Sequence, residues 1–280
     1  MTQTNNPLRR FFRQPSIYLR LPSQGKYYPP GTLDMPPNGE LPILPMTALD
    51  EILARTPDAL FNGSATAEVI RSCVPNIQDP WAVPSVDLNA LLVASRVASY
   101  GHEMPVPTTC PKCETEQEVE LDLRVVLDSL RAADYDQPLQ QGDMLIYFAP
   151  LTYRQMNENS RIKFDDEKLL QSLAEGGNTE EQKLVQLGET FRRVTEMTVN
   201  VVSDSIAAIK TNDAMVTEKE YIREFLKNCP KTVFEAIKDH AVELRRGSDL
   251  KPLALTCSQC QHQYQQEFTL DMSNFFGAAS

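Results

Sequence analysis

The stretch Cys110-Pro111-Lys112-Cys113 and its counterpart Cys257-Ser258-Gln259-Cys260 decide the fold of this chain, because each holds two thiols with two residues between them. Two thiolates at this spacing can hold one metal ion from a single tight turn, and two such turns complete a tetrahedral site of four sulfurs. A shared site would clamp together segments that are far apart in the sequence. The residues between them would then form an insertion into a zinc ribbon.

A strand-like run follows each pair of cysteines, which supports one shared site. The first run is Glu118–Leu123 and the second is Glu267–Met272. Four thiolates around zinc leave no open coordination position, so such a site suits a structural role and not catalysis. The alternatives are four thiols without a metal, or a redox pair, which is disfavoured because neither pair stands between a strand and a helix. We therefore predict a structural zinc ion with four ligands: Cys110, Cys113, Cys257 and Cys260.

The composition is that of a globular protein with an acidic balance. The chain has 280 residues, 41% hydrophobic and 23% charged, and its net charge is −11. Nucleic-acid binding is disfavoured, because no excess of cations is present to neutralise phosphates. No apolar run is long enough for a membrane span, and the N-terminus lacks the apolar core of a secretory signal. We therefore expect folding in a reducing cytoplasm, where paired cysteines more often bind metal than form disulfides.

The N-terminal residues 1–46 are predicted to form an extended arm. Basic and aromatic residues between Arg9 and Arg13 come first, and a stretch rich in proline and glycine follows them. Proline fixes φ and removes a hydrogen-bond donor, and glycine permits turns, so this stretch is expected to be extended. Two interpretations remain open: a strap that lies on the core of its own chain, or an arm that docks on a neighbouring subunit.

Helical patterns dominate residues 47–109. Thr47 is a predicted N-cap with acidic residues in the first turn that follows, where the helix dipole favours anions. Asp87–Tyr100 carries a broad apolar face, and Gly101 is well placed to end that helix.

Residues 125–252 are predicted to be a mostly helical insertion. A buried strand is predicted at Met144–Ala149. Apolar residues then recur at helical spacing over 179–210, with Ile206 and Ile209 as the last of them. Thr217 with Glu220 predicts a capping box that opens a further helix.

The predicted fold class is therefore α+β and mainly helical: a split four-cysteine zinc ribbon with a large helical insertion and an extended N-terminal arm. Its predicted parts are the arm at 1–46, the helical region at 47–109, the two ribbon halves at 110–124 and 253–272, and the insertion at 125–252.

No pattern in the sequence indicates catalysis. Nucleophile elbow, phosphate-binding loop, dinucleotide fingerprint and HExxH motif are all missing from the sequence. His262 stands two residues after Cys260, but four cysteines suffice for a site, so it is interpreted as a surface histidine. The two remaining cysteines, Cys73 and Cys229, are interpreted as buried small hydrophobes. We predict no catalytic residue, no small-molecule substrate and no cofactor other than zinc.

The order of several short elements resembles the T4-like bacteriophage baseplate hub and baseplate assembly protein family. The resemblance covers about residues 16–272 and rests on these stretches: Leu21–Tyr28, Pro45–Leu53, Asn62-Gly63, Val74-Pro75, Asp87–Gly101, Cys110–Cys113 and Ile222–Leu244. No single stretch is highly specific, but their order is. The resemblance implies a structural or assembly protein of the baseplate of a contractile-tailed phage, at the hub or wedge, with no known chemistry.

The leading functional prediction is thus a non-enzymatic baseplate component that acts through protein contacts. Its expected partners are other baseplate or tail subunits, reached through the N-terminal arm, with no nucleic acid and no membrane involved. It is expected in the tail of the virion, and in the host cytoplasm during assembly. The alternatives are a zinc-ribbon protein that regulates through nucleic acid, which the net charge of −11 disfavours, and a hub-associated hydrolase.

Overall fold

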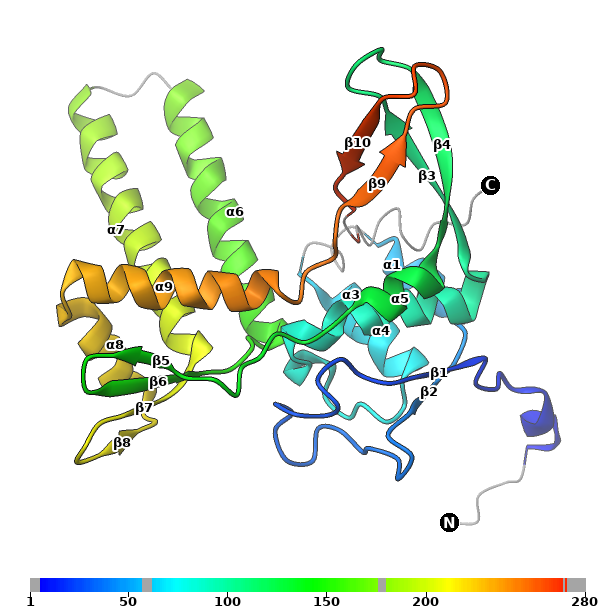
Figure 1. Cartoon of the computed structure of the whole chain (residues 1–280), viewed down its shortest axis with the longest axis horizontal. Coiled ribbons are helices and arrows are strands. Elements are labelled where there is room, and N and C mark those ends of the chain that lie inside the picture. Colours follow the sequence, from blue (N-terminus) through cyan, green and yellow to red (C-terminus); the bar gives the residue numbers. More distant parts are fainter. Residues whose placement is uncertain (1–5, 57–61, 176–179, 269, 271–280) are drawn as a thin grey trace. The chain divides into compact units, whose positions relative to one another are not determined.

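The computed structural model describes residues 6–56, 62–175, 180–268 and 270, and it combines helices with small antiparallel sheets (Figure 1). Contacts along the chain divide it into two compact units. The first comprises Met1–Pro80, Asp87–Leu130 and Asp249–Ser280, and the second comprises Trp81–Val86 and Arg131–Ser248. Within the described residues, no helix has both the length and the apolar character needed to cross a membrane.

The first unit contains the N-terminal segment, a group of helices and two β-hairpins. Its N-terminal elements are the 3-10 helix η1 (Pro7–Phe11) and the strands β1 (Ile17–Leu19) and β2 (Leu41–Ile43). Its helices are α1 (Ala48–Ala54), α3 (Ser64–Cys73), α4 (Ser85–Tyr100, whose first two residues are assigned to the second unit) and α5 (Leu123–Ser129). Its hairpins are formed by β3 (Glu103–Thr109) with β4 (Glu116–Asp122), and by β9 (Leu253–Thr256) with β10 (Gln263–Gln266).

Residues 17–43 lie on the core of their own unit, as the strap interpretation predicts. β1 and β2 pair in antiparallel register, from Ile17 opposite Ile43 to Leu19 opposite Leu41. Leu41 and Ile43 are fully buried, and Leu21 keeps only 2% of its surface exposed. Because this apolar area is removed from water inside the same unit, the strap stabilises its own chain.

The strap is locked to α4 by a buried carboxylate. Asp87, in the first turn of α4, is fully buried and accepts hydrogen bonds from the backbone N–H of Ser23, at 2.8 Å, and from the Ser23 hydroxyl. Burial raises the pKa of Asp87 to about 6, although the hydrogen bonds from Ser23 act in the opposite direction. Ser23 of the strap therefore stabilises the Asp87 carboxylate through hydrogen bonds in place of water.

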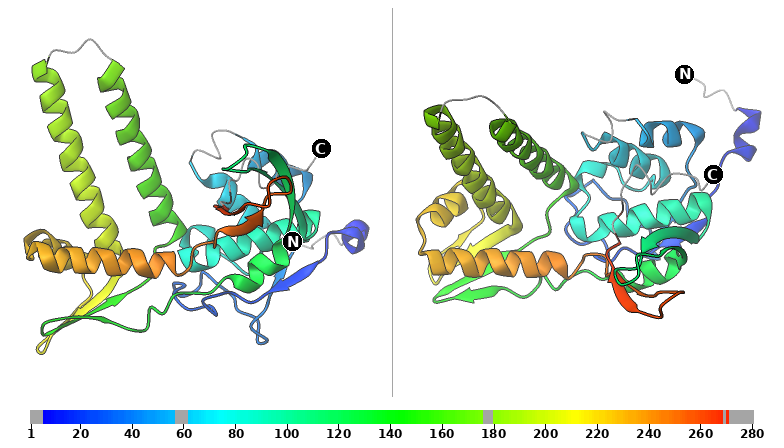
Figure 2. Two further views of the ribbon diagram at one scale, coloured as in Figure 1. Left: turned by 45° about the horizontal axis from the view of Figure 1, so that its top comes forward. Right: turned by 90° about the horizontal axis from the view of Figure 1, so that it is seen from above.

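The second unit is built on a four-stranded antiparallel sheet. The strands are β5 (Leu139–Gln141), β6 (Met144–Phe148), β7 (Ile206–Lys210) and β8 (Met215–Val216), in that order across the sheet. The helices are α6 (Tyr153–Glu175), α7 (Glu180–Ser205), α8 (Lys219–Asn228) and α9 (Lys231–Arg246). Figure 2 shows α6 and α7 as a long pair that extends away from the sheet of this unit. The core includes Ile146, Ile206, Ile222 and Ile237, all with no exposed surface.

Two local predictions in this unit were wrong. Ile206 and Ile209 were assigned to a helix, but they lie in β7, where Ile209 is opposite Ile146 of β6. The two isoleucines are three residues apart, and this spacing suits one face of a helix as well as an irregular strand. Only the pairing with β6 shows that the strand is formed. The expected cap Thr217 is also not used: α8 has Glu218 at its N-cap and no side-chain cap hydrogen bond.

Lys219, the first residue of α8, caps the C-terminal end of α7. Its Nζ donates hydrogen bonds to the carbonyl oxygens of Ser203 at 3.0 Å, Asp204 at 3.1 Å and Ile206. The carbonyls of Ser203 and Asp204 lie in the last turn of α7, where the oxygens have no helical partners, and Ile206 follows directly as the first residue of β7. A lysine there also complements the negative end of the helix dipole, and its burial lowers the pKa of the ammonium. The long helix α7 is thus capped by a side chain from the start of α8.

Candidate metal centre

The two cysteine pairs occupy the tips of two β-hairpins in the first unit. The first pair lies between β3 and β4, whose last register pair is Thr109 with Glu116. The second lies between β9 and β10, whose last register pair is Thr256 with Gln263. Figure 1 shows the two hairpins side by side with both tips at the same end. The two paired strands of each hairpin hold the turn at its tip in place.

The strand predicted after the second cysteine pair was misplaced. β10 covers Gln263–Gln266, whereas the prediction placed a strand at Glu267–Met272. Glu267 and Phe268 lie outside β10, and 269, 271 and 272 lie outside the described residues. The tight turn around Cys260 brings the residues that follow it into register with β9, so the strand forms there and not at the apolar stretch further along the chain. The strands before each cysteine pair, β3 and β9, were not predicted.

The two tips share one backbone geometry. In the first, the N–H of Glu114 donates to the Cys110 carbonyl at 2.9 Å, and the N–H of Cys110 donates to Thr115 O at 3.0 Å. In the second, Gln261 donates to the Cys257 carbonyl at 3.1 Å, and Cys257 donates to the His262 carbonyl at 2.9 Å. The residue after each second cysteine has positive φ, 58° at Glu114 and 56° at Gln261. This left-handed residue closes the turn and directs both sulfurs of a pair to the same side.

The fold brings together the four cysteines that the sequence singles out. Their sulfur atoms all lie within 4.8 Å of one another. Cys110 Sγ is 3.7 Å from Cys260 Sγ, and Cys113 Sγ is 3.6 Å from Cys257 Sγ, so each short distance joins the two hairpins. Four sulfurs placed about 2.3 Å from a central zinc ion in a tetrahedron lie about 3.8 Å apart. The cluster can therefore hold a metal ion, and its spacing fits a tetrahedral four-thiolate site.

Burial and hydrogen bonding differ among the four thiols. Cys110 and Cys257 are fully buried, Cys260 is half-buried and Cys113 is exposed. The hydroxyl and the backbone N–H of Thr115 lower the pKa of the Cys113 thiol to about 6, because both can donate to the thiolate once it forms. A thiolate is the form that binds a metal ion, so this environment prepares one ligand at neutral pH.

Side chains that the sequence did not single out join the hairpins below the sulfurs. Gln117 of β4 accepts hydrogen bonds from the N–H of Ser258 at 2.9 Å and from its hydroxyl at 3.0 Å. Its amide donates to the hydroxyl of Tyr264 in β10 at 3.1 Å. Thr108 of β3 lies 3.1 Å from the same hydroxyl and donates to Gln266 Oε1 at 3.3 Å. These contacts fix one hairpin against the other. They could not be predicted from the sequence, because polar residues at alternating strand positions are common.

The histidine and the two further cysteines that the sequence singled out are not part of the sulfur cluster. His262 is half-buried, its ring stacks on that of Tyr264 with centroids 6.4 Å apart, and it is not among the grouped ligands. Cys73 is fully buried in α3, as predicted, and Cys229 is half-buried at the end of α8.

Comparison with known proteins identifies the family. A family model described as T4 bacteriophage base plate protein matches residues 32–277, which is most of the chain. The chain belongs to this family. Baseplate membership confirms the resemblance seen in the sequence, and it implies a component of the virion tail that interacts with other tail or baseplate proteins. No curated protein and no solved structure matched the chain.

Proposed function

We propose that this baseplate protein is a non-enzymatic structural or assembly component of the hub or wedge of a contractile-tailed phage, stabilised by a structural zinc ion. The family match carries the baseplate role. The four sulfur atoms, all within 4.8 Å of one another, support the proposed metal site. In this proposal the protein acts through contacts with neighbouring subunits, to which the N-terminal arm contributes, and it is assembled in the host cytoplasm.

The proposed zinc ion is held by two thiolates from each hairpin tip. Four thiolates close the coordination sphere, so the metal stabilises a fold and leaves no position for a substrate. Its binding energy would be added to folding, because the unfolded chain does not hold the two tips together. The proposed parts are the split ribbon at 110–124 and 253–272, the helical insertion at 125–252 that the ribbon closes, the helical region at 47–109 and the arm at 1–46.

Metal analysis of the purified chain tests the site. We expect one zinc ion per chain, lost to the same extent in Cys110→Ser and Cys257→Ser, because each variant removes one ligand of the same ion. Cys229→Ser is the matched control and keeps its zinc. Absence of zinc, with all six cysteines reacting freely in the folded protein, would contradict the site. Loss of zinc from only one of the two ligand variants would show that the hairpin tips do not share a metal.

Genetic removal tests the baseplate role. Phage that lack this chain are expected to produce no complete baseplates by electron microscopy, and the Cys110→Ser variant is expected to reproduce part of the defect. Normal contractile tails without the chain would contradict a structural or assembly role.

A further inference from the structure

An acidic face of the first hairpin has no partner among the described residues. Successive side chains of a strand point to opposite faces, so Glu116, Glu118 and Glu120 share one face of β4. All three are exposed, and no ion pair or hydrogen bond to their carboxylates is found in the described part of the chain. Their register partners are Thr109, Pro107 and Pro105 of β3, respectively. Glutamates therefore stand in a row beside two prolines, with no cation between them.

This face also borders a cavity. The cavity has a volume of about 640 Å³, and its lining includes Pro107, Thr109, Glu116, Glu118 and Gln266. That volume lies within the range of about 300 to 1,000 Å³ that is typical of sites for bound groups. The lining combines the proline ring of Pro107 and two carboxylates with polar side chains, among them Thr108 and Gln117, which suits an occupant that carries positive charge and hydrogen-bond donors beside its apolar groups.

The N-terminal segment of the same chain has this chemistry. Phe11 and Phe12 of the segment Pro7–Phe12 are 69% and 54% exposed. Arg9 and Arg10 are exposed too, and the Arg10 guanidinium lies 4.7 Å from the centroid of the Phe11 ring. The segment contains no acidic residue, although the whole chain carries a net charge of −11. Aromatic and arginine side chains, phenylalanine included, are enriched at protein interfaces relative to the rest of the surface.

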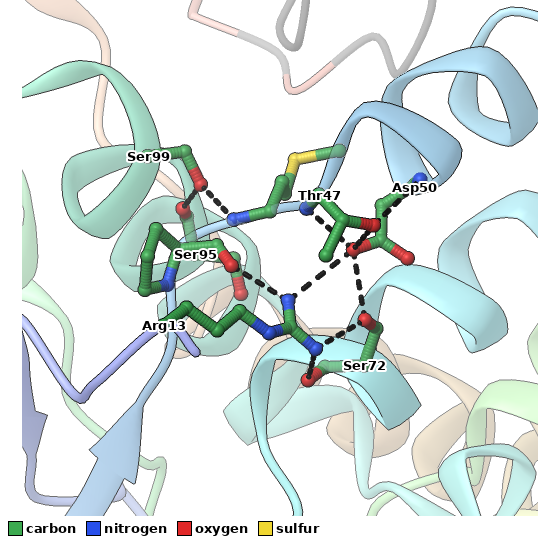
Figure 3. Close-up of polar contacts among 8 residues, drawn as sticks. Arg13, Thr47, Asp50, Ser72, Ser95 and Ser99 are labelled. Atoms are coloured by element: carbon green, nitrogen blue, oxygen red, sulfur yellow. Dashed lines mark hydrogen bonds and ion pairs between the residues drawn. The ribbon is translucent and has the colours of Figure 1, made fainter. Parts of the chain in front are cut away.

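Arg13, the residue that follows this segment, anchors its C-terminal end to the first unit (Figure 3). Its guanidinium donates to the Pro45 carbonyl at 2.6 Å, to Asp50 Oδ2 at 3.3 Å, and to the carbonyl and hydroxyl of Ser72, both at 2.8 Å. Asp50 Oδ2 also accepts hydrogen bonds from the backbone N–H and hydroxyl of Thr47, so the network ties the segment to α1 and α3. A segment that is anchored at one end has fewer conformations to lose on docking than a free one.

We propose that the segment Pro7–Phe12 of one copy docks on the Glu116–Glu120 face and its cavity in a second copy of this chain. Arg9 and Arg10 pair with the glutamates, and the phenylalanine rings cover the prolines and enter the cavity. In this proposal the docking is intermolecular, because Figure 1 shows η1 apart from β4, which carries the glutamates, in its own unit. This inference deepens the proposed assembly role of the arm and does not depend on the zinc ion.

The two docking surfaces are different, so the contact is head-to-tail. Such a contact produces a ring if the rotation between copies closes, and an open chain of copies if it does not. Each copy offers one segment and one acidic face. A variant with a defective segment therefore still has a working face, and a variant with a defective face still has a working segment.

Sedimentation velocity of the full-length, metal-loaded protein tests the proposal over a range of concentration and salt. We expect self-association that weakens as salt rises, because salt screens exposed charge pairs. Arg9→Glu with Arg10→Glu, and separately Glu116→Arg with Glu118→Arg, are each expected to weaken it by about ten-fold or more. The matched charge reversals Lys231→Glu and Asp213→Arg, at exposed sites in the second unit, are expected to leave it unchanged.

Mixing the two charge-reversed variants gives the decisive result. One intact segment and one intact face remain between them, and the two reversed surfaces are also opposite in charge, so the mixture is expected to regain association, while each variant alone associates more weakly by about ten-fold or more. Circular dichroism and zinc content equal to those of the parent chain show that both variants are folded. A parent chain that is monomeric at every concentration overturns the proposal, and so does a mixture that forms no pair. Binding only to a different baseplate protein would also overturn it, while leaving the proposed baseplate role intact.

Discussion

Replacing Asp87 with asparagine is expected to remove a pH-dependent loss of stability from this protein. The Asp87 carboxyl is fully buried beneath the strap, and its pKa is raised from 3.8 to about 6 by that burial. Asparagine has the shape of the protonated acid. Its amide oxygen can accept the hydrogen bond from the Ser23 N–H, now 2.8 Å long, and its NH₂ group can donate to the Ser23 hydroxyl.

The magnitude follows from the difference in the Asp87 pKa between the folded and unfolded states. A carboxyl with a higher pKa in the folded state binds its proton more tightly there, so the folded state binds more protons than the unfolded state. Stability is then greatest at low pH, falls as pH rises from about 4 to about 6, and stays constant above that window. A pKa difference of one corresponds to about 1.4 kcal/mol, so the fall is about 3 kcal/mol. The asparagine variant has no charge to bury and lacks this fall.

Urea unfolding followed by far-ultraviolet circular dichroism, repeated along a pH series, measures this effect. The free energy of unfolding of Asp87→Asn, minus that of the parent chain, is expected to rise by about 2.4 kcal/mol between pH 4 and pH 7, since part of the fall has already occurred at pH 4. Taking this difference cancels the pH dependence that the two proteins share, including that of the thiols. Asp128→Asn, at an exposed position on α5, is the control and should give a flat difference. A flat difference for Asp87→Asn as well would refute the assignment of a buried, charged carboxylate.

Three further substitutions test contacts that the fold creates. Gln117→Ala removes hydrogen bonds that join the hairpins and is expected to speed transfer of bound metal to a chelator by about ten-fold. The control Gln263→Ala, at an exposed position of β10, is expected to leave the transfer rate unchanged, and equal rates for the two variants would contradict the bridging role of Gln117. Arg13→Ala is expected to lower the free energy of unfolding by about 1 to 3 kcal/mol and to speed trypsin cleavage ahead of the strap, and an unchanged cleavage rate would show that Arg13 does not anchor the segment. Lys219→Met leaves carbonyls of α7 without partners and is expected to lower the free energy of unfolding by about 1 to 3 kcal/mol. Urea unfolding followed by the fluorescence of Trp81, which lies in the same unit, measures this loss, and the exposed control Lys210→Met is expected to show none.

Much of the helical architecture could be read from local patterns. Thr47 caps α1 as predicted, with the Asp50 side chain completing a capping box, because capping depends on residues only three positions apart. The helix predicted at Asp87–Tyr100 is confirmed as α4, Ser85–Tyr100, for a similar local reason. Ile206 and Ile209 were misassigned because their environment depends on β6, about sixty residues earlier in the chain.

The candidate site shows the same division. Spacing within each cysteine pair is a local property, so both pairs could be recognised as metal-binding turns. The residues that hold the turns together could not, because Gln117 reaches Ser258 across 141 positions of sequence, and nothing in either segment alone indicates the contact. The predicted role of the four cysteines as zinc ligands stays a prediction, although their sulfurs do lie together.

The sequence by itself determined the family, the two cysteine turns and most helices, since each of these is written in the order or spacing of nearby residues. Only the tertiary structure decided that the strap lies on its own core, that Asp87 is buried with a raised pKa, and that the four sulfurs converge. The physical reason is that burial and long-range pairing depend on which segments meet in space. A carboxylate or a thiol acquires its chemistry from those neighbours and not from its position in the chain.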